Sequence, residues 1–107
     1  MSETFRRVIE LIERQEVVIS EHAEERLDDH SITMEDIESE ATQAIVVEDY
    51  PEYHAGPSVL VLQRDLKGQP IHVVWGILKQ RTSPAVLVTA YRPDPDRWED
   101  GFLRRKP

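Results

Sequence analysis

The sequence predicts one α+β domain, residues 1–107, in which N-terminal helices pack on one face of a roughly four-stranded antiparallel sheet. Apolar residues at helical spacing are confined to the first part of the chain, up to about residue 42. From Ala44 onward β-branched residues dominate, in short runs that turn residues separate. Helices followed by a meander of strands are typical of the α+β class. A chain of 107 residues has the length of one domain, and it contains no repeat or internal boundary.

Residues 1–16 contain the first expected element, an amphipathic helix. Its apolar residues recur three and four positions apart, as on one face of a helix, and charged residues fill the opposite face. The apolar positions are Phe5, Val8, Ile9 and Ile12. We expect residues 17–19 to form a short extended link to the next helix.

A second helix is expected at residues 21–30, with Ser20 as its N-cap. On this helix His22, Arg26 and His30 are four positions apart and therefore lie along one edge. Phosphodiester chemistry requires a proton-transfer group beside a fixed cation, which this edge supplies. The same column is equally compatible with a solvated helix face.

A third helix and four strands complete the expected elements. Thr33 and Asp36 resemble a capping box, which predicts a helix at residues 34–42. Apolar runs between proline and glycine turns predict the strands. The expected strands are residues 44–50, 58–65, 70–78 and 85–91, and a tail or short helix follows at residues 100–107.

Alternation along the last two strands predicts which side chains face the helices. The expected core residues are Ile71, Val73, Trp75 and Ile77 of the third strand and Val86, Val88 and Ala90 of the fourth. His72 is then expected on the opposite, open face of the sheet. Tyr91 is expected beside it.

The chain is acidic, with 21 Asp and Glu residues against 13 Lys and Arg and a formal net charge of −8. Nucleic-acid-binding proteins are usually basic, so any contact with RNA must use a local basic patch. Most basic residues lie from Arg64 onward, whereas residues 21–52 contain only Arg26. This asymmetry fits an enzyme with a local basic site, and equally an acidic module that docks on a basic partner.

The absence of cysteine excludes disulfides, thiolate catalysis and zinc ribbons. No apolar run approaches the roughly 20 residues of a membrane span, and the first residues do not resemble a targeting peptide. We therefore expect a cytoplasmic protein. His22, Glu25 and Asp29 come nearest to a set of metal ligands, but no second histidine lies at ligand spacing. No metal and no cofactor are expected.

Five segments together resemble the bacterial domain-of-unknown-function family 4258. They are HAEER at residues 22–26, SITMEDI at 31–37, VVEDYP at 46–51, PIHVVWGI at 70–77 and TAYRPDPDRWE at 89–99. The resemblance covers residues 18–99, nearly the whole chain. It implies a fold similar to that of the RelE and BrnT toxin ribonucleases. It also implies a toxin–antitoxin pair in which the antitoxin carries a zinc-finger domain.

The resemblance further implies metal-independent RNA cleavage, in which the 2′-hydroxyl attacks the adjacent phosphate. One group removes the 2′ proton, another protonates the leaving 5′ oxygen, and a cation stabilises the charge on phosphorus. Histidine, with a pKa of about 6.5, serves either proton-transfer role at neutral pH. The residues expected in the site are His22 and His72 as base and acid, Arg26 as the phosphate-binding cation, Tyr91 as orienting group or proton donor, and Arg64 and Arg92 on flanking phosphates.

Each expected catalytic residue also has a purely structural interpretation. His22 braces its helix, Arg26 forms an ordinary ion pair, His72 is half-buried without chemistry, and Tyr91 packs with its hydroxyl hydrogen-bonded. The alternative function is therefore a catalytically silent protein-interaction module or a homodimer of the same fold. Convergence of the four residues in one positively charged pocket favours the enzyme, whereas their scattering favours the module.

Overall fold

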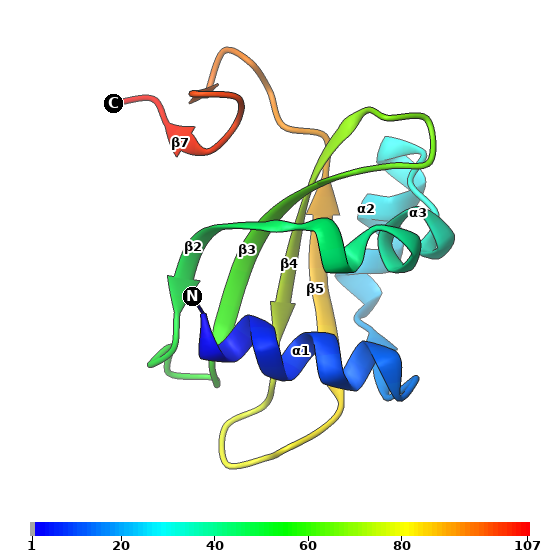
Figure 1. The fold of residues 1–107 in the computed structure, drawn as a ribbon, viewed down its shortest axis with the longest axis vertical. Coiled ribbons are helices and arrows are strands. Elements are labelled where there is room, and N and C mark those ends of the chain that lie inside the picture. The colour runs from blue at the N-terminus through cyan, green and yellow to red at the C-terminus, as the bar shows by residue number, and fades with distance from the viewer. Residues whose placement is uncertain (1) are drawn as a thin grey trace.

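The computed structural model describes residues 2–107, which form three helices and a five-stranded mixed sheet (Figure 1). The helices are α1 (Glu3–Glu13), α2 (Glu21–His30) and α3 (Met34–Ser39), and a 3-10 turn (Ala41–Gln43) follows α3. The sheet strands are β1 (Val17–Ile19), β2 (Ile45–Tyr50), β3 (Ser58–Arg64), β4 (Pro70–Gly76) and β5 (Ala85–Tyr91). The α+β prediction is confirmed. No helix of residues 2–107 is both long and apolar enough to cross a bilayer.

The sheet has the strand order β1-β5-β4-β3-β2, and its first strand corrects the prediction of four antiparallel strands. Residues 17–19 are a strand rather than a link, and β1 pairs with β5 in parallel, Val17 opposite Ala85. A three-residue run carries too little pattern to be recognised, and its partner lies far along the chain. Ser20 joins the two elements, because its hydroxyl accepts from the Ala23 N–H as the N-cap of α2 and donates to the Val88 carbonyl of β5.

The helices cover one face of the sheet, which we call the inner face. Buried residues of all three helices form one hydrophobic cluster with alternating residues of β3, β4 and β5. The expected pattern of β4 is confirmed, since Ile71, Val73, Trp75 and Ile77 all belong to this cluster. His72 points to the opposite side of the sheet, which we call the outer face.

The expected inner face of β5 is confirmed for Ala90 and wrong for Val86 and Val88. The cluster contains Ala85, Leu87 and Ala90, whereas Val86 and Val88 line a hollow of the outer face. The cause is a bulge, because Val74 lies opposite Thr89 while its neighbour Trp75 lies opposite Leu87. One extra residue shifts the alternation of side chains by one position, so the residues before the bulge face the opposite way from what the residues after it predict. Tyr91 nevertheless shares the outer face with His72 and lies directly opposite it.

The second and third helices begin as the sequence predicts, but α3 is shorter than expected. Thr33 and Asp36 form the capping box, in which each side chain accepts from the other residue's backbone N–H. The helix ends at Ser39 because the side chain of Gln63 on β3 donates to the Ile37 carbonyl, at 2.9 Å. That carbonyl would otherwise accept the next helical hydrogen bond.

The C-terminal residues form a small hairpin of strands β6 (Trp98–Glu99) and β7 (Arg104–Arg105), rather than a free tail or helix. Figure 1 shows this hairpin beyond the end of β5, away from α1. Three consecutive residues with positive φ, Asp100, Gly101 and Phe102, turn the chain between its strands. The hairpin lies against the outer face through Trp98, whose ring contacts His72.

Two buried carboxylates predict how acid affects stability. Burial raises the pKa of Asp36 and of Asp65, but hydrogen bonds from backbone N–H groups and neighbouring side chains outweigh it, so both pKa values are lowered. Their stabilisation is therefore complete above the unfolded value of about 3.9 and is lost as the pH falls through the folded values. We expect the free energy of unfolding in urea to fall steeply below about pH 4. Asp36→Asn should flatten that dependence, and an unchanged dependence would contradict this account.

Candidate functional site

The four expected catalytic residues do not meet in one place. His22 is exposed on α2, and its side chain makes no hydrogen bond within residues 2–107. Arg26 pairs with Asp29 at 3.1 Å on the same helix. Because α2 packs on the inner face while His72 and Tyr91 lie on the outer face, the sheet separates the two pairs. The edge that His22 and Arg26 share is a surface of α2 that neither His72 nor Tyr91 reaches.

The two arginines expected on flanking phosphates are held by the protein itself. The Arg64 guanidinium donates to the Gly68 carbonyl in the turn between β3 and β4, at 3.1 Å. Arg92 donates to the carbonyls of His30 and Ser31 and to the Asp65 carboxylate, at 3.0, 3.3 and 2.9 Å. Arg92 therefore ties the end of α2 to the turn after β3.

His72 and Tyr91 form a hydrogen-bonded pair whose direction the structure fixes. The Phe102 carbonyl, 2.9 Å from His72 Nε2, only accepts, so Nε2 carries the hydrogen. Nδ1 is then an acceptor, and the Tyr91 hydroxyl donates to it at 3.2 Å. Trp98 packs edge-on against the imidazole, with ring centroids 4.4 Å apart.

His72 is fully buried, which corrects the expectation that it lies on an open face. The sheet face is open in the pattern of the strands, but the C-terminal hairpin covers it at this point through Trp98 and Phe102. Burial lowers the pKa of His72, and the hydrogen bond to the Phe102 carbonyl offsets this only in part. Burial likewise raises the pKa of Tyr91. Both groups are therefore neutral at neutral pH.

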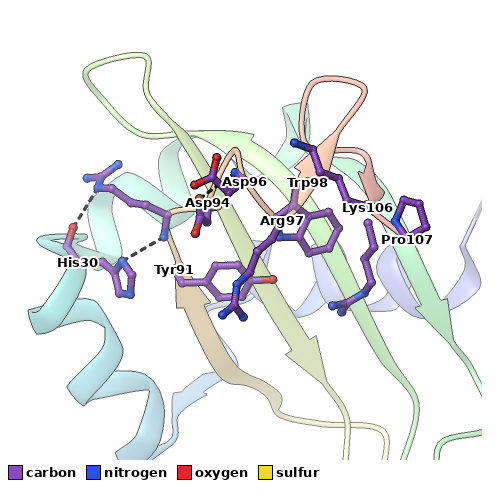
Figure 2. Close-up of a pocket in the computed structure, with 10 residues that line it drawn as sticks. His30, Tyr91, Asp94, Asp96, Arg97, Trp98, Lys106 and Pro107 are labelled. Atoms are coloured by element: carbon purple, nitrogen blue, oxygen red, sulfur yellow. Dashed lines mark hydrogen bonds between the residues drawn. The ribbon is translucent and has the colours of Figure 1, made fainter.

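Tyr91 also forms part of the wall of a pocket of about 650 Å³, which we call the cationic pocket. Its lining residues are His30, Tyr91, Arg92, Asp94, Asp96, Arg97, Trp98, Arg105, Lys106 and Pro107. Figure 2 shows Tyr91, Arg97 and Trp98 close together, with Lys106 and Pro107 on the side away from His30. Four cationic side chains and two carboxylates line the pocket, and two of these cations, Arg92 and Arg105, are already paired with Asp65 and Glu48.

The cations of the pocket differ in how far the protein already uses them. Arg97 and Lys106 are exposed, and neither forms an ion pair within residues 2–107. Arg105 donates twice to Glu48, at 2.7 and 3.0 Å, and its guanidinium lies 4.8 Å from the Trp98 ring centre. Hydrogen bonds from Arg105, and then from Tyr50, keep the pKa of Glu48 below its usual value. Arg97 and Lys106 are therefore fully available to an anion, whereas Arg105 can offer only the N–H groups that Glu48 does not accept.

His30, which the sequence analysis placed on the same helix edge as His22 and Arg26, lines the pocket. Its Nδ1 accepts the backbone N–H of Arg92 at 3.2 Å, so the neutral imidazole carries its hydrogen on Nε2. Sequence reasoning missed Arg97, Arg105 and Lys106. The signal available for them was a cluster of basic and aromatic residues at the end of an acidic chain.

Metal ligands do not gather in the part of the chain that the structure describes. Across residues 2–107 no group of three or more His, Asp or Glu side chains is arranged to hold a metal ion. The polar side chains that do lie together are the hydrogen-bonded pairs described above.

Comparison with known proteins gives one match. No curated protein matches the chain, and no solved structure matches it. The model of the family described as Domain of unknown function (DUF4258) matches residues 19–92, which run from the end of β1 through β5. The C-terminal hairpin lies outside this match. Since the match covers more than half of the chain, the protein belongs to the DUF4258 family.

Proposed function

We propose that the protein is an endoribonuclease that binds an RNA phosphodiester in the cationic pocket, as a toxin of a bacterial toxin–antitoxin pair. One observation carries the proposal. Tyr91, which is hydrogen-bonded to His72, lines the same pocket as three cations of the C-terminal segment. Proton transfer and charge stabilisation are thereby adjacent, as phosphodiester cleavage requires. The three cations are Arg97, Arg105 and Lys106.

The proposed reaction is attack of the RNA 2′-hydroxyl on the adjacent phosphorus. The Tyr91 oxygen takes the 2′ proton while its own proton passes to His72 Nδ1, and the new bond joins the 2′ oxygen to phosphorus. The bond from phosphorus to the 5′ oxygen breaks, and the Lys106 ammonium protonates that oxygen. The products are a 2′,3′-cyclic phosphate and a 5′-hydroxyl. His72 then returns its proton to Tyr91, which releases one to solvent, and Lys106 takes up a proton from solvent.

The remaining groups of the pocket bind and stabilise the negatively charged phosphate and do not transfer protons. Arg97 and the free N–H of Arg105 donate to the phosphate oxygens, which carry extra negative charge in the transition state. His30 donates a hydrogen bond through Nε2, because its Nδ1 already accepts from Arg92. This route uses no metal and no cofactor, and cleavage is expected to persist in EDTA.

Substitutions in the cationic pocket distinguish RNA cleavage by this site from cleavage by a contaminating nuclease. We expect Arg97→Ala and Lys106→Ala each to lower the rate of cleavage of a single-stranded RNA by about 10-fold or more, because each removes a charge that stabilises the transition state. The matched control is Lys67→Ala, which removes an exposed lysine of the β3–β4 turn and should leave the rate unchanged. Product ends are read by their 2′,3′-cyclic phosphates.

The same variants are expected to relieve growth arrest when the protein is expressed in a bacterium. A natural sequence that neither arrests growth nor cleaves RNA would contradict the proposal, as would equal rates for all three variants. A zinc-finger antitoxin protein is the partner proposed for the toxin, and its co-expression should restore growth.

The second candidate function is a catalytically silent interaction module or homodimer. Two observations favour it: His22 and Arg26 lie away from the pocket, and His72 is fully buried with both ring nitrogens engaged. If the protein has this second function, we expect RNA to remain intact in its presence. Sedimentation should then detect a dimer or a stable complex with a protein partner.

A further inference from the structure

A groove continues from the cationic pocket across the outer face of the sheet. It has a volume of about 430 Å³ and shares two wall residues with the pocket, Tyr91 and Arg105. Leu60, Val74 and Thr89, from three neighbouring strands, also line it. A ligand whose anionic group lies in the pocket therefore has a mainly apolar channel beside it.

Two half-exposed tyrosines line this groove. Tyr50 is 46% exposed and Tyr53 is 51% exposed, so both rings are accessible beside the apolar wall of the groove. An exposed aromatic ring beside a cationic site offers a stacking surface for a planar group.

The Tyr50 ring is held in place before any ligand binds, whereas the Tyr53 ring contacts only the exposed ring next to it in the sequence. The Tyr50 hydroxyl donates to Glu48 at 2.8 Å, and the same carboxylate accepts both hydrogen bonds of Arg105. The Tyr53 ring packs on His54, with centroids 4.3 Å apart. A preorganised ring loses little conformational entropy when a ligand stacks on it. Glu48 and Arg105 form an ion pair, so together they add no net charge to this end of the groove.

We propose that this groove is a base-binding subsite, in which a nucleobase next to the bound phosphate stacks on Tyr53 or Tyr50. The inference rests on the proposed function, because it extends the same RNA site from the phosphate to the neighbouring base. The ligand class follows from the chemistry: a nucleotide joins a phosphate, through its sugar, to a planar aromatic base whose face stacks on a tyrosine ring. A paired base cannot stack in this way, so the subsite selects unpaired RNA.

Binding of a trinucleotide that cannot be cleaved tests the subsite without catalysis. The probe is 2′-O-methyl UUU, compared by calorimetry with an abasic trimer that carries the same phosphates. We expect the natural protein to bind the probe at least about 10-fold more tightly than the abasic trimer, the usual contribution of base stacking on an aromatic ring. Tyr50→Ala and Tyr53→Ala together should remove this ratio, whereas Tyr50→Phe with Tyr53→Phe, which retains both rings, should keep it.

The outcomes separate this inference from the proposed function. Base-dependent binding without RNA cleavage would support the subsite and overturn the nuclease. Cleavage with equal affinity for both trimers, or a ratio that survives loss of both rings, would overturn the subsite alone. Equal affinity for both trimers together with a protein partner that protects Tyr53 would assign the groove to that partner instead and also overturn the subsite.

Discussion

Tyr91→Phe is expected to lower the RNA cleavage rate by about 100-fold or more while leaving the fold intact, because a positioned proton-transfer group contributes at least that factor. The hydroxyl is the only atom lost, and the ring keeps its edge-on contact with His72, at a centroid distance of 5.3 Å. The rate is measured on a single-stranded RNA at saturating protein. The unfolding midpoint in urea serves as the check on the fold.

His22→Ala is the informative comparison, because the sequence and the structure predict different results for it. The column of residues on α2 predicts a loss of activity, whereas the exposed position of His22 predicts none. A loss in His22→Ala with full activity in Tyr91→Phe would move the chemistry to the helix and contradict the site described above.

The pH dependence of cleavage provides a second check on the same pair. Burial lowers the pKa of His72 below its usual value of about 6.5 and raises that of Tyr91 above about 10. His72 must be neutral to accept the Tyr91 proton, so we expect the rate to rise through a pKa below about 6.5 and then to stay level toward about pH 9. A rate that rises only above pH 8 would assign the base to another group.

Asp65→Ala is expected to destabilise the fold by about 3 kcal/mol, the range for removing one partner of a buried, hydrogen-bonded ion pair. The Asp65 side chain is 4% exposed and accepts from the backbone N–H groups of Lys67 and Gln69, each at 2.8 Å. It also accepts from Arg92, whose other hydrogen bonds hold the end of α2. Urea unfolding measures the change in the free energy of unfolding.

Asp28→Asn is the matched control for Asp65, since Asp28 is exposed on α2 and forms no ion pair within residues 2–107. A surface substitution of this kind should change stability by no more than about 0.5 kcal/mol. If Asp65→Ala behaves like this control, the turn after β3 does not depend on its carboxylate.

Local patterns in the sequence were sufficient for the elements whose determinants lie within a few residues. Ser20 before α2 and the pair of Thr33 and Asp36 before α3 satisfy backbone N–H groups of the adjacent turn, so short-range spacing reveals them. The alternation of β4 was equally readable, because no bulge interrupts its pairing with β3. It placed His72 on the outer face, and the alternation at the end of β5, beyond the bulge, placed Tyr91 beside it.

The rest depends on contacts that short-range patterns do not contain. The bulge between β4 and β5 inverts the expected inner face of β5, and only the pairing with β4 reveals it. The burial of His72 depends on Trp98 and Phe102, which fold back from the C-terminal hairpin. The cationic pocket could not be predicted for the same reason, since the C-terminal hairpin is what brings Arg97 and Lys106 into one pocket with Tyr91.

The parallel pairing of β1 with β5 sets the order in which the molecule is expected to fold. Ser20 and Val88, which it brings together, are 68 residues apart, and closing so long a loop costs more conformational entropy than closing the turns of the β3–β5 meander. β1 is therefore expected to join the sheet last. Because the Ser20 hydroxyl that caps α2 also donates to the Val88 carbonyl of β5, the start of the helix is fixed on the sheet at that same step. Docking of α2 and closure of the sheet edge should consequently appear as one cooperative transition.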